Sequence, residues 1–243
     1  MNIVTHGLRR ERVPTTEERA RASRRDFFRK TGLGLAGVGV LLTACESDED
    51  ASDARGTAVD LGTGDVGVLN YAFALEQIEA AFYARVLSGG YYLGLGARDP
   101  ERQVLEALEA HERAHRAFFA EVIPTVGTAI PDLEVDFSGI DFGDRASVLA
   151  AAQTFEDLGV SAYNGAGRLL TNPDYLTFAG KIVSVEARHA AVIRDLLQDS
   201  PTAFADGTVV DADGLDLART PAEVLATAAE FVATALDASK LPA

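Results

Sequence analysis

The sequence predicts an all-α fold: a four-helix bundle with a long crossover between its second and third helices, plus a short C-terminal helix. Three observations predict it. Four long segments place apolar residues at the spacing of a helix face, not in the alternation of a strand. A long Pro-containing stretch separates the second segment from the third, and no segment carries a strand pattern. The four segments are residues 65–88, 100–122, 145–170 and 173–198.

The starts of the second and fourth helices carry the same signal. Asp99 before Pro100 predicts an N-cap followed by a first-turn proline. Asn172 before Pro173 repeats the arrangement. The first connection, residues 89–99, is of medium length, and the connection between the third and fourth helices is tight.

The connection between the second and third helices is the longest. Residues 123–144 contain Pro124, Pro131 and the aromatic and acidic run DFSGIDFGD. A connection of this length can travel along the bundle, so the second and third helices can run parallel instead of forming a hairpin.

The C-terminal extension, residues 199–243, begins as a loop and then predicts one short helix. Thr220 is its expected N-cap and Glu223 the expected capping-box partner, with Pro221 in the first turn. We expect this helix to end near residue 238 and to pack on the outside of the bundle.

Residues 1–44 read as an export signal. The paired Arg24 and Arg25 precede an apolar run at 31–44 that is too short to span a bilayer as a stable helix. The stretch resembles a twin-arginine export signal, and LTAC at its end resembles the lipobox at which bacterial lipoproteins are cleaved and lipidated, here on Cys45. These resemblances imply a protein that folds before export, often with its cofactor bound, and a membrane-anchored lipoprotein facing the periplasm or cell exterior. The alternative is an uncleaved anchor or a disordered tail with a free thiol.

Residues 45–64 are polar, acidic and rich in Gly, Ser and Ala, which predicts a flexible tether. No core is expected before about Val66, so the bundle is assigned to residues 65–198. The assignment leaves three parts outside the bundle: the signal, the tether and the C-terminal extension.

Charge and cysteine content exclude several classes of function. The chain carries a net charge of −15, and without residues 1–44 it keeps 13 basic and 33 acidic residues. An excess of this size near −20 excludes nucleic-acid binding. Cys45 is the only cysteine, so the chain can form neither an intramolecular disulfide nor a thiolate metal site.

Each predicted helix carries chemically active residues on its otherwise apolar face. The second and fourth helices carry a Glu-x-x-His pair, whose two side chains share one face about one turn apart. The first and third helices carry glutamate followed by tyrosine. In chain order these residues are Glu76, Glu79 and Tyr83; Glu112 and His115; Glu156 and Tyr163; and Glu186 and His189.

This set, with a carboxylate from each of two helices and Glu-x-x-His from each of the other two, resembles that of ferritin-like di-iron and di-manganese proteins. The resemblance covers residues 66–198 and is strongest to exported bacterial ferritin-like domain proteins, some called desiccation-related, through LEQIEAAFY, HERAH, FEDLGVSAYNGA and VEARH. It implies a ferritin-like bundle that binds two iron or manganese ions. The implied metal ligands are Glu79 or Glu76, with Glu112, His115, Glu156, Glu186 and His189.

The residue types suit such a centre. Two divalent cations bring four positive charges that four ionised glutamates offset, so the cluster becomes neutral once metal enters. Carboxylates and imidazoles are ligands that iron and manganese accept, and a carboxylate can bridge two ions. Without metal, four buried glutamates cannot all stay ionised, and we expect most of them to take up protons.

Several assignments stay open on the sequence alone. Glu76 and Glu79 are three residues apart and can both face inward; Glu79 is slightly favoured as the ligand, with Glu76 as a ligand or its neighbour. Tyr83 and Tyr163 are interpreted as core residues with one hydrogen bond each, not as redox participants. His111 lies off the pattern and is interpreted as a surface residue or a neighbour of the ligands.

The resemblance implies redox chemistry on ferrous ion, oxygen or peroxide, in protection against oxidative or desiccation stress. Electron delivery of the rubrerythrin type needs a four-cysteine iron site, which this chain cannot build. A closed iron-storage cage does not suit a tethered protein. Two alternatives remain: a non-catalytic metal-binding or structural protective bundle, and an oxygenase, which would need an apolar pocket beside the metals.

Overall fold

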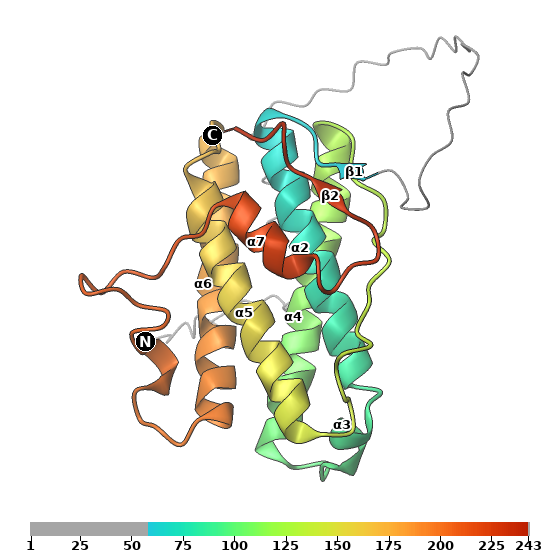
Figure 1. Ribbon diagram of the computed structural model, residues 1–243, viewed down its shortest axis with the longest axis vertical. Coiled ribbons are helices and arrows are strands. Elements are labelled where there is room, and N and C mark those ends of the chain that lie inside the picture. The colour runs from blue at the N-terminus through green and yellow to red at the C-terminus, as the bar shows by residue number, and fades with distance from the viewer. Residues whose placement is uncertain (1–57, 243) are drawn as a thin grey trace, which may run out of the picture. The chain divides into compact units, whose positions relative to one another are not determined.

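The computed structural model describes residues 58–242, which form an all-α bundle as predicted (Figure 1). The export-signal residues Arg24 and Arg25, the lipidation site Cys45 and most of the predicted tether lie outside the described residues. Four long helices make the bundle: α2 (Gly64–Val86), α4 (Pro100–Val122), α5 (Arg145–Gly167) and α6 (Pro173–Leu197).

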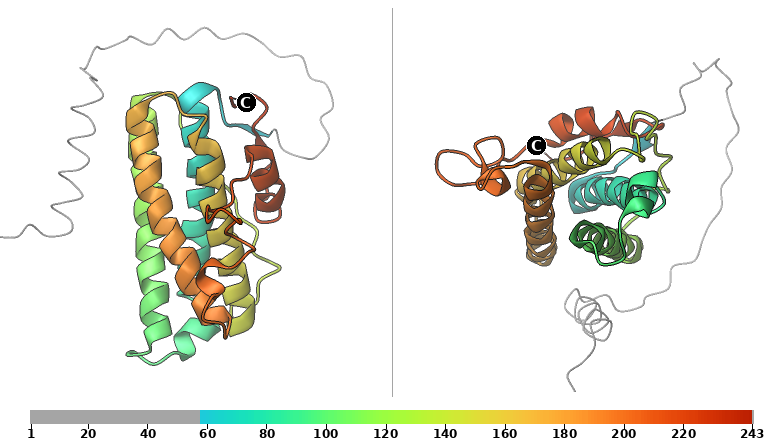
Figure 2. Two further views of the ribbon diagram at one scale, coloured as in Figure 1. Left: turned by 90° about the vertical axis from the view of Figure 1, so that its left-hand side faces the viewer. Right: turned by 90° about the horizontal axis from the view of Figure 1, so that it is seen from below.

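The four helices pack as two pairs, and Figure 2 shows them side by side and from one end. The most extensive contacts join α5 to α6 and α2 to α4. In Figure 1, α4 and α5 both rise from the lower end of the bundle, whereas α2 and α6 descend. The connection between α4 and α5 starts with a 3₁₀ helix, η1 (Ile123–Thr125), and then runs back along the bundle. The predicted crossover, with parallel second and third helices, is confirmed.

The predicted helix starts are also confirmed. The Asp99 side chain accepts a hydrogen bond from the Glu101 N–H at 2.9 Å, ahead of α4. The Asn172 side chain accepts one from the Asp174 N–H at 2.9 Å, ahead of α6. Each cap satisfies an N–H group that has no partner inside its helix.

Helix α2 is buried along nearly all of its length, because α4, α5 and the crossover cover its different sides. Two of its polar side chains form hydrogen bonds with the backbone of the crossover. The Asn70 amide donates to the Thr128 carbonyl at 2.9 Å and accepts from the Ile130 N–H at 3.0 Å. Gln77 accepts from the Leu133 N–H at 2.8 Å. The buried polar residues of α2 must therefore find their partners in the interior.

The first connection contains a short helix, α3 (Gly90–Gly94), where the sequence predicted only a loop. The Tyr91 N–H donates to the Phe142 carbonyl at 3.0 Å, which docks α3 on the crossover. A Cβ atom on Gly89 would lie 2.6 Å from that same oxygen. Only glycine allows so close an approach of the two backbones.

The core begins earlier than the expected Val66. Strand β1 (Val59–Asp60) pairs in parallel with β2 (Leu236–Asp237), and Leu61 is fully buried. The sequence showed no strand pattern because each strand has only two residues, too few for a period to register. The last part of the predicted tether is therefore a structured part of the domain.

The C-terminal helix α7 (Pro221–Ala228) has the predicted Thr220 and Glu223 capping box, but it ends at Ala228, not near residue 238. The chain after it pairs with the crossover instead. The Asp136 N–H donates to the Phe231 carbonyl at 2.8 Å, and the Phe231 ring packs on an aromatic ring of α5. These long-range contacts override the helical pattern of the segment. Within residues 58–242, no helix combines the length and the apolarity that crossing a bilayer requires.

Candidate metal centre

Five glutamates from the four long helices are buried in the interior of the bundle. They are Glu76 and Glu79 on α2, Glu112 on α4, Glu156 on α5 and Glu186 on α6. The exposed fraction is 3% for Glu79 and 0% for the other four. Removing an ionised carboxylate from water costs several kcal/mol unless a partner compensates, so the cluster requires an explanation.

Two groups of residues could each hold a metal ion, because one ligand atom from every member lies within 4.8 Å of the others. The His115 group consists of Glu76, Glu112, His115 and Glu186. The His189 group consists of Glu112, Glu156, Glu186 and His189. Since Glu112 and Glu186 belong to both groups, their carboxylates are placed to bridge two ions.

Each histidine turns its Nδ1 atom toward the glutamates of its own group. His115 Nδ1 lies 2.8 Å from Glu186, 3.2 Å from Glu112 and 3.4 Å from Glu76. His189 Nδ1 lies 2.7 Å from Glu112, 3.3 Å from Glu186 and 3.4 Å from Glu156. Both imidazoles therefore present the same nitrogen to the carboxylates and turn Nε2 away from them.

Two buried tyrosines hold the outer oxygens of two glutamates. The Tyr83 hydroxyl on α2 donates to Oε1 of Glu156 on α5. The Tyr163 hydroxyl on α5 donates to Oε1 of Glu76 on α2. Each tyrosine thus fixes the carboxylate of the opposite helix and leaves its Oε2 atom facing the cluster. This agrees with the interpretation of both tyrosines as core residues that make one hydrogen bond.

Most inward atoms of the two groups have no aligned hydrogen bond among the described residues, although His115 Nδ1 and Glu112 Oε2 form one at 3.2 Å. The unpaired atoms do not point at one another, as expected of ligand atoms that converge on a shared point. Buried polar groups are nearly always paired, so an unpaired set of carboxylate and imidazole atoms is what a metal-binding cluster would present. The atoms are Glu76 Oε2, Glu112 Oε1, Glu156 Oε2, Glu186 Oε1, Glu186 Oε2 and His189 Nδ1. Their number and chemistry fit divalent metal ions.

A family model described as "Ferritin-like domain" matches residues 64–199, more than half of the chain. The chain belongs to the ferritin-like family. A search of curated proteins found no match. The matched segment contains every member of both groups, so the ferritin-like domain and the buried cluster that could hold metal coincide.

Burial is the main influence on two carboxyl groups of this ferritin-like domain. It raises the pKa of Glu76 to about 8, although the neighbouring His115 imidazole opposes the shift. It raises the pKa of Glu156 to about 8 as well, against the opposing effect of His189. In the absence of metal, both carboxyl groups therefore hold protons at neutral pH.

The histidines and Glu112 shift the opposite way, toward their charged forms. Burial disfavours an imidazolium, but Glu112, Glu156 and Glu186 outweigh it and raise the pKa of His189 to about 12. Glutamates likewise raise the pKa of His115 above its usual value in spite of burial. Burial alone would raise the pKa of Glu112, yet the adjacent His115 and His189 outweigh it and bring that pKa down to about 2. In the metal-free cluster, two imidazolium ions thus supply the positive charge beside the glutamates.

Glu79 lies outside both groups, whereas Glu76 belongs to the His115 group, so the geometry favours Glu76 over Glu79 as the candidate ligand on α2. Three residues advance a helix by about 4.5 Å, and that displacement along α2 separates the Glu79 carboxyl from the ligand atoms. Its Oε1 atom faces α5, where a Cβ on Gly159 would approach it to 2.9 Å. Burial, followed by the charges of Glu186 and Glu112, raises the pKa of Glu79 well above its usual value. Glu79 is a neutral acid beside the centre.

The sequence left the role of His111 open, as a surface residue or a neighbour of the ligands. It is exposed, and its Nδ1 atom also lies 2.9 Å from Nε2 of His189. The two ring planes are nearly parallel, 9° apart, with centroids 5.2 Å apart. The available signal was spacing: His111 precedes His115 by four residues, which places both on one face of α4.

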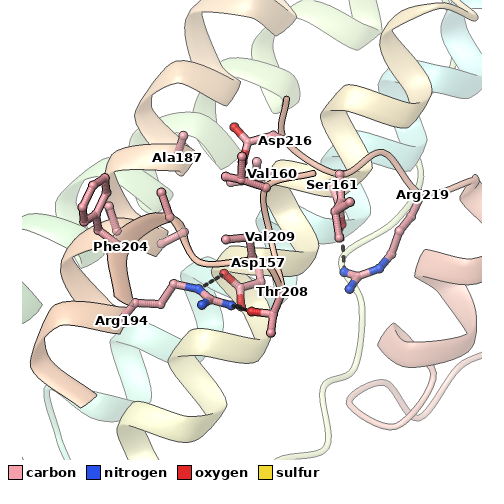
Figure 3. Close-up of a pocket in the computed structure, with 15 residues that line it drawn as sticks. Asp157, Val160, Ser161, Ala187, Arg194, Phe204, Thr208, Val209, Asp216 and Arg219 are labelled. Carbon is pink, nitrogen blue, oxygen red and sulfur yellow. Dashed lines mark hydrogen bonds and ion pairs between the residues drawn. The ribbon is translucent and has the colours of Figure 1, made fainter. Parts of the chain in front are cut away.

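A separate cavity of about 210 Å³ lies between α5, α6 and the segment from 204 to 219 (Figure 3). In it, Arg194 pairs with Asp157 at 2.7 Å and reaches the Thr208 hydroxyl at 3.0 Å. Arg219 donates to the Ser161 hydroxyl at 2.9 Å. These arginines fasten the C-terminal extension to the bundle. No member of either metal group lines this cavity, so it is distinct from the metal centre.

Proposed function

We propose that this ferritin-like domain binds two iron or manganese ions, one in each group, for redox chemistry on ferrous ion, oxygen or peroxide. The observation that carries the proposal is the sharing of Glu112 and Glu186 between the two groups. Two carboxylates common to two ligand sets are suited to a dinuclear centre. Bound iron or manganese would supply Lewis acidity together with one-electron oxidation and reduction.

Each ligand has a distinct part in the proposal. Glu112 and Glu186 would bridge the two ions, while His115 and His189 would each bind one ion through Nδ1. Glu76 would complete the first position. Glu156 would complete the second, with its carboxylate held by Tyr83 as Glu76 is held by Tyr163.

Proton release would accompany metal binding. The pKa values of about 8 for Glu76 and Glu156 mean that both carboxyl groups carry protons in the metal-free protein at neutral pH. Their ionised forms are the better ligands, and four ionised glutamates balance the charge of two divalent ions. Protons must therefore leave as metal enters.

A cavity of about 10 Å³ touches Glu79 and Gly159, and no member of either metal group lines it. Its volume is that of about one water-sized molecule. The oxygenase alternative would need an apolar pocket beside the ligands for an organic substrate.

Metal analysis of the exported protein, followed by ferrous-oxidation and peroxide-removal assays, tests the proposal. The expected result is two iron or manganese ions per chain and turnover with at least one substrate. Two ions without turnover would support the non-catalytic alternative. Failure to bind either metal at neutral pH would overturn the dinuclear centre.

The proposal places the domain outside the cytoplasm, tethered to a membrane, in a role of protection against oxidative or desiccation stress. Its support is the sequence pattern around Arg24, Arg25 and Cys45. A reporter fused to residues 1–64 tests it. Replacing Arg24 and Arg25 with Lys should abolish export, and Cys45→Ser should release the exported reporter from the membrane. The upstream pair Arg9 and Arg10 provides the matched control, since its replacement by Lys should change neither; export without Arg24 and Arg25 would contradict the proposal.

A further inference from the structure

The two histidines of the centre differ in what lies behind them. His189 turns Nδ1 toward its glutamates, and its Nε2 atom meets Nδ1 of His111 at 2.9 Å. His115 also turns Nδ1 toward its glutamates, but no described residue is hydrogen-bonded to its Nε2 atom. The exposed fraction of the side chain is 13% for His115 and 5% for His189.

The contact between the two imidazoles determines which nitrogen carries hydrogen. A neutral imidazole that binds a cation through Nδ1 must carry its proton on Nε2. In His189 that Nε2–H points at His111 Nδ1, which can accept it only when unprotonated.

The geometry of the rings adds an orientation constraint. The planes of His111 and His189 are only 9° apart, so His111 limits rotation of the His189 ring about its bond to the chain. Metal-bound histidines commonly donate their second N–H to an acceptor that fixes the tautomer and the ring orientation. His111 provides this acceptor on one side of the centre only.

We propose that His111 is a positioning residue that holds His189 with Nδ1 toward the His189 group, so that this group binds its ion more tightly than the His115 group. The inference rests on the proposed function, since it assumes a dinuclear centre. It adds to that function an inequality between the two positions and a residue that produces it.

A titration of the metal-free protein with manganese(II) tests this inference. Binding is measured by calorimetry and by the electron spin resonance of free manganese. Wild type should bind two ions in two separable steps. His111→Ala and His111→Phe should weaken the tighter step by about 10-fold or more, the range seen when the acceptor behind a ligand histidine is lost. Both should leave the weaker step within about 3-fold of wild type.

Two further variants separate the hydrogen bond from packing. His111→Asn places an amide oxygen near the position of Nδ1 and should restore most of the lost affinity, whereas His111→Phe keeps an aromatic ring without an acceptor. Arg113→Ala, an exposed neighbour on α4, is the control and should bind as wild type does.

A nitrogen NMR spectrum gives a readout independent of affinity. In the metal-free protein, His111→Ala should shift the His189 Nε2 resonance, because that atom loses its contact with His111 Nδ1. Two wild-type ions with unchanged binding by His111→Ala would overturn the inference while leaving the proposed function intact. Full affinity in His111→Phe would overturn it too, and a wild type that binds no manganese or iron would instead overturn the proposed function.

Discussion

The α2–α5 half of the centre and the α4–α6 half differ in burial, in hydrogen bonding and in the charge they carry. On the first half, Glu76 and Glu156 are fully buried, and each accepts a hydrogen bond from a tyrosine on the opposite helix. On the second half, each helix supplies a Glu-x-x-His pair, and the imidazoles approach the surface, with His115 13% exposed and His111 more so.

The difference shows how a buried cluster of like charges survives without metal. On the α2–α5 half the carboxyl groups are neutral, because burial raises the pKa of Glu76 and of Glu156 to about 8. On the α4–α6 half the side chains are charged, because the pKa of Glu112 falls to about 2 while that of His189 rises to about 12. When metal binds, the α2–α5 half would therefore release the protons of its carboxyl groups, and the α4–α6 half would release the protons of its imidazolium ions.

Glu112→Gln should give the largest effect, because it breaks the charged half. Glu112 belongs to both groups, so both ions should bind more than about 100-fold more weakly. The metal-free protein should lose about 3 kcal/mol of unfolding free energy, since two imidazolium ions lose their ionised partner. Metal titration and denaturant unfolding measure the two effects. Glu109→Gln, which removes a carboxylate paired with Arg113 on the same helix, is the control; loss of only one ion would contradict the bridging position of Glu112.

The pH dependence of stability should run in opposite directions with and without metal. Glu76 and Glu156 have folded pKa values of about 8 against 4.5 for the unfolded chain, so the folded state binds more protons across that window. Metal-free stability should therefore fall as pH rises from 4.5 to 8, by up to about 1.4 kcal/mol per unit for each group. His189 adds to the decline above pH 6.5, because its folded pKa is about 12.

Metal-loaded protein should become more stable over the same range, because protons compete with the ions for the ligands. Below pH 4.5 both forms should lose stability as Glu112, with a folded pKa of about 2, takes up a proton. Thermal melts at several pH values, with and without manganese, check the two curves. Parallel curves would show that the cluster does not exchange protons for metal.

Glu156→Gln should separate the two halves, because it changes only the neutral one. Gln keeps the shape of the side chain and can still accept from Tyr83, while it removes an acid that the metal-free protein must keep protonated. The metal-free protein should be as stable as wild type or up to about 1 kcal/mol more stable. Metal affinity should fall, with the His189 group affected most. Calorimetry on wild type and mutant, each with and without metal, measures this, and a destabilised metal-free mutant would contradict the neutral state of Glu156.

The tyrosines should give the smallest effects, and equal ones. Tyr83→Phe and Tyr163→Phe each remove one donor to a buried carboxyl group, at a cost of about 1 to 2 kcal/mol in denaturant unfolding. Tyr71→Phe is the matched control, because its buried hydroxyl has no hydrogen-bond partner among the described residues. Its loss should be neutral or stabilising. A clear difference between Tyr83→Phe and Tyr163→Phe would show that the α2–α5 half is less symmetric than its hydrogen bonds.

The sequence alone predicted the features that local geometry fixes. Asp99 and Asn172 marked helix starts because an N-cap acts within its own first turn. The Glu-x-x-His pairs could be placed on one face of each helix because helical spacing determines that face. Tyr83 and Tyr163 were interpreted as core residues with one hydrogen bond each because they lie on the apolar faces of their helices.

Only the tertiary structure decided the features that depend on how elements meet. Helix α2 is buried on nearly every side, so both Glu76 and Glu79 face the interior, and only the tertiary structure places Glu76, and not Glu79, in a group that could hold a metal ion. The tyrosines donate to glutamates of the opposite helix, which no spacing within one helix can show. The pairing of β1 with β2 also joins segments far apart in the sequence, so no local pattern predicted it.

The contact of His111 with His189 joins residues 78 positions apart. A sequence specifies each helix through interactions between near neighbours, and it specifies the rest through contacts that form only when distant faces pack together. For this protein the ligand types belong to the first class, while the choice of Glu76 over Glu79 and the residue behind each ligand belong to the second.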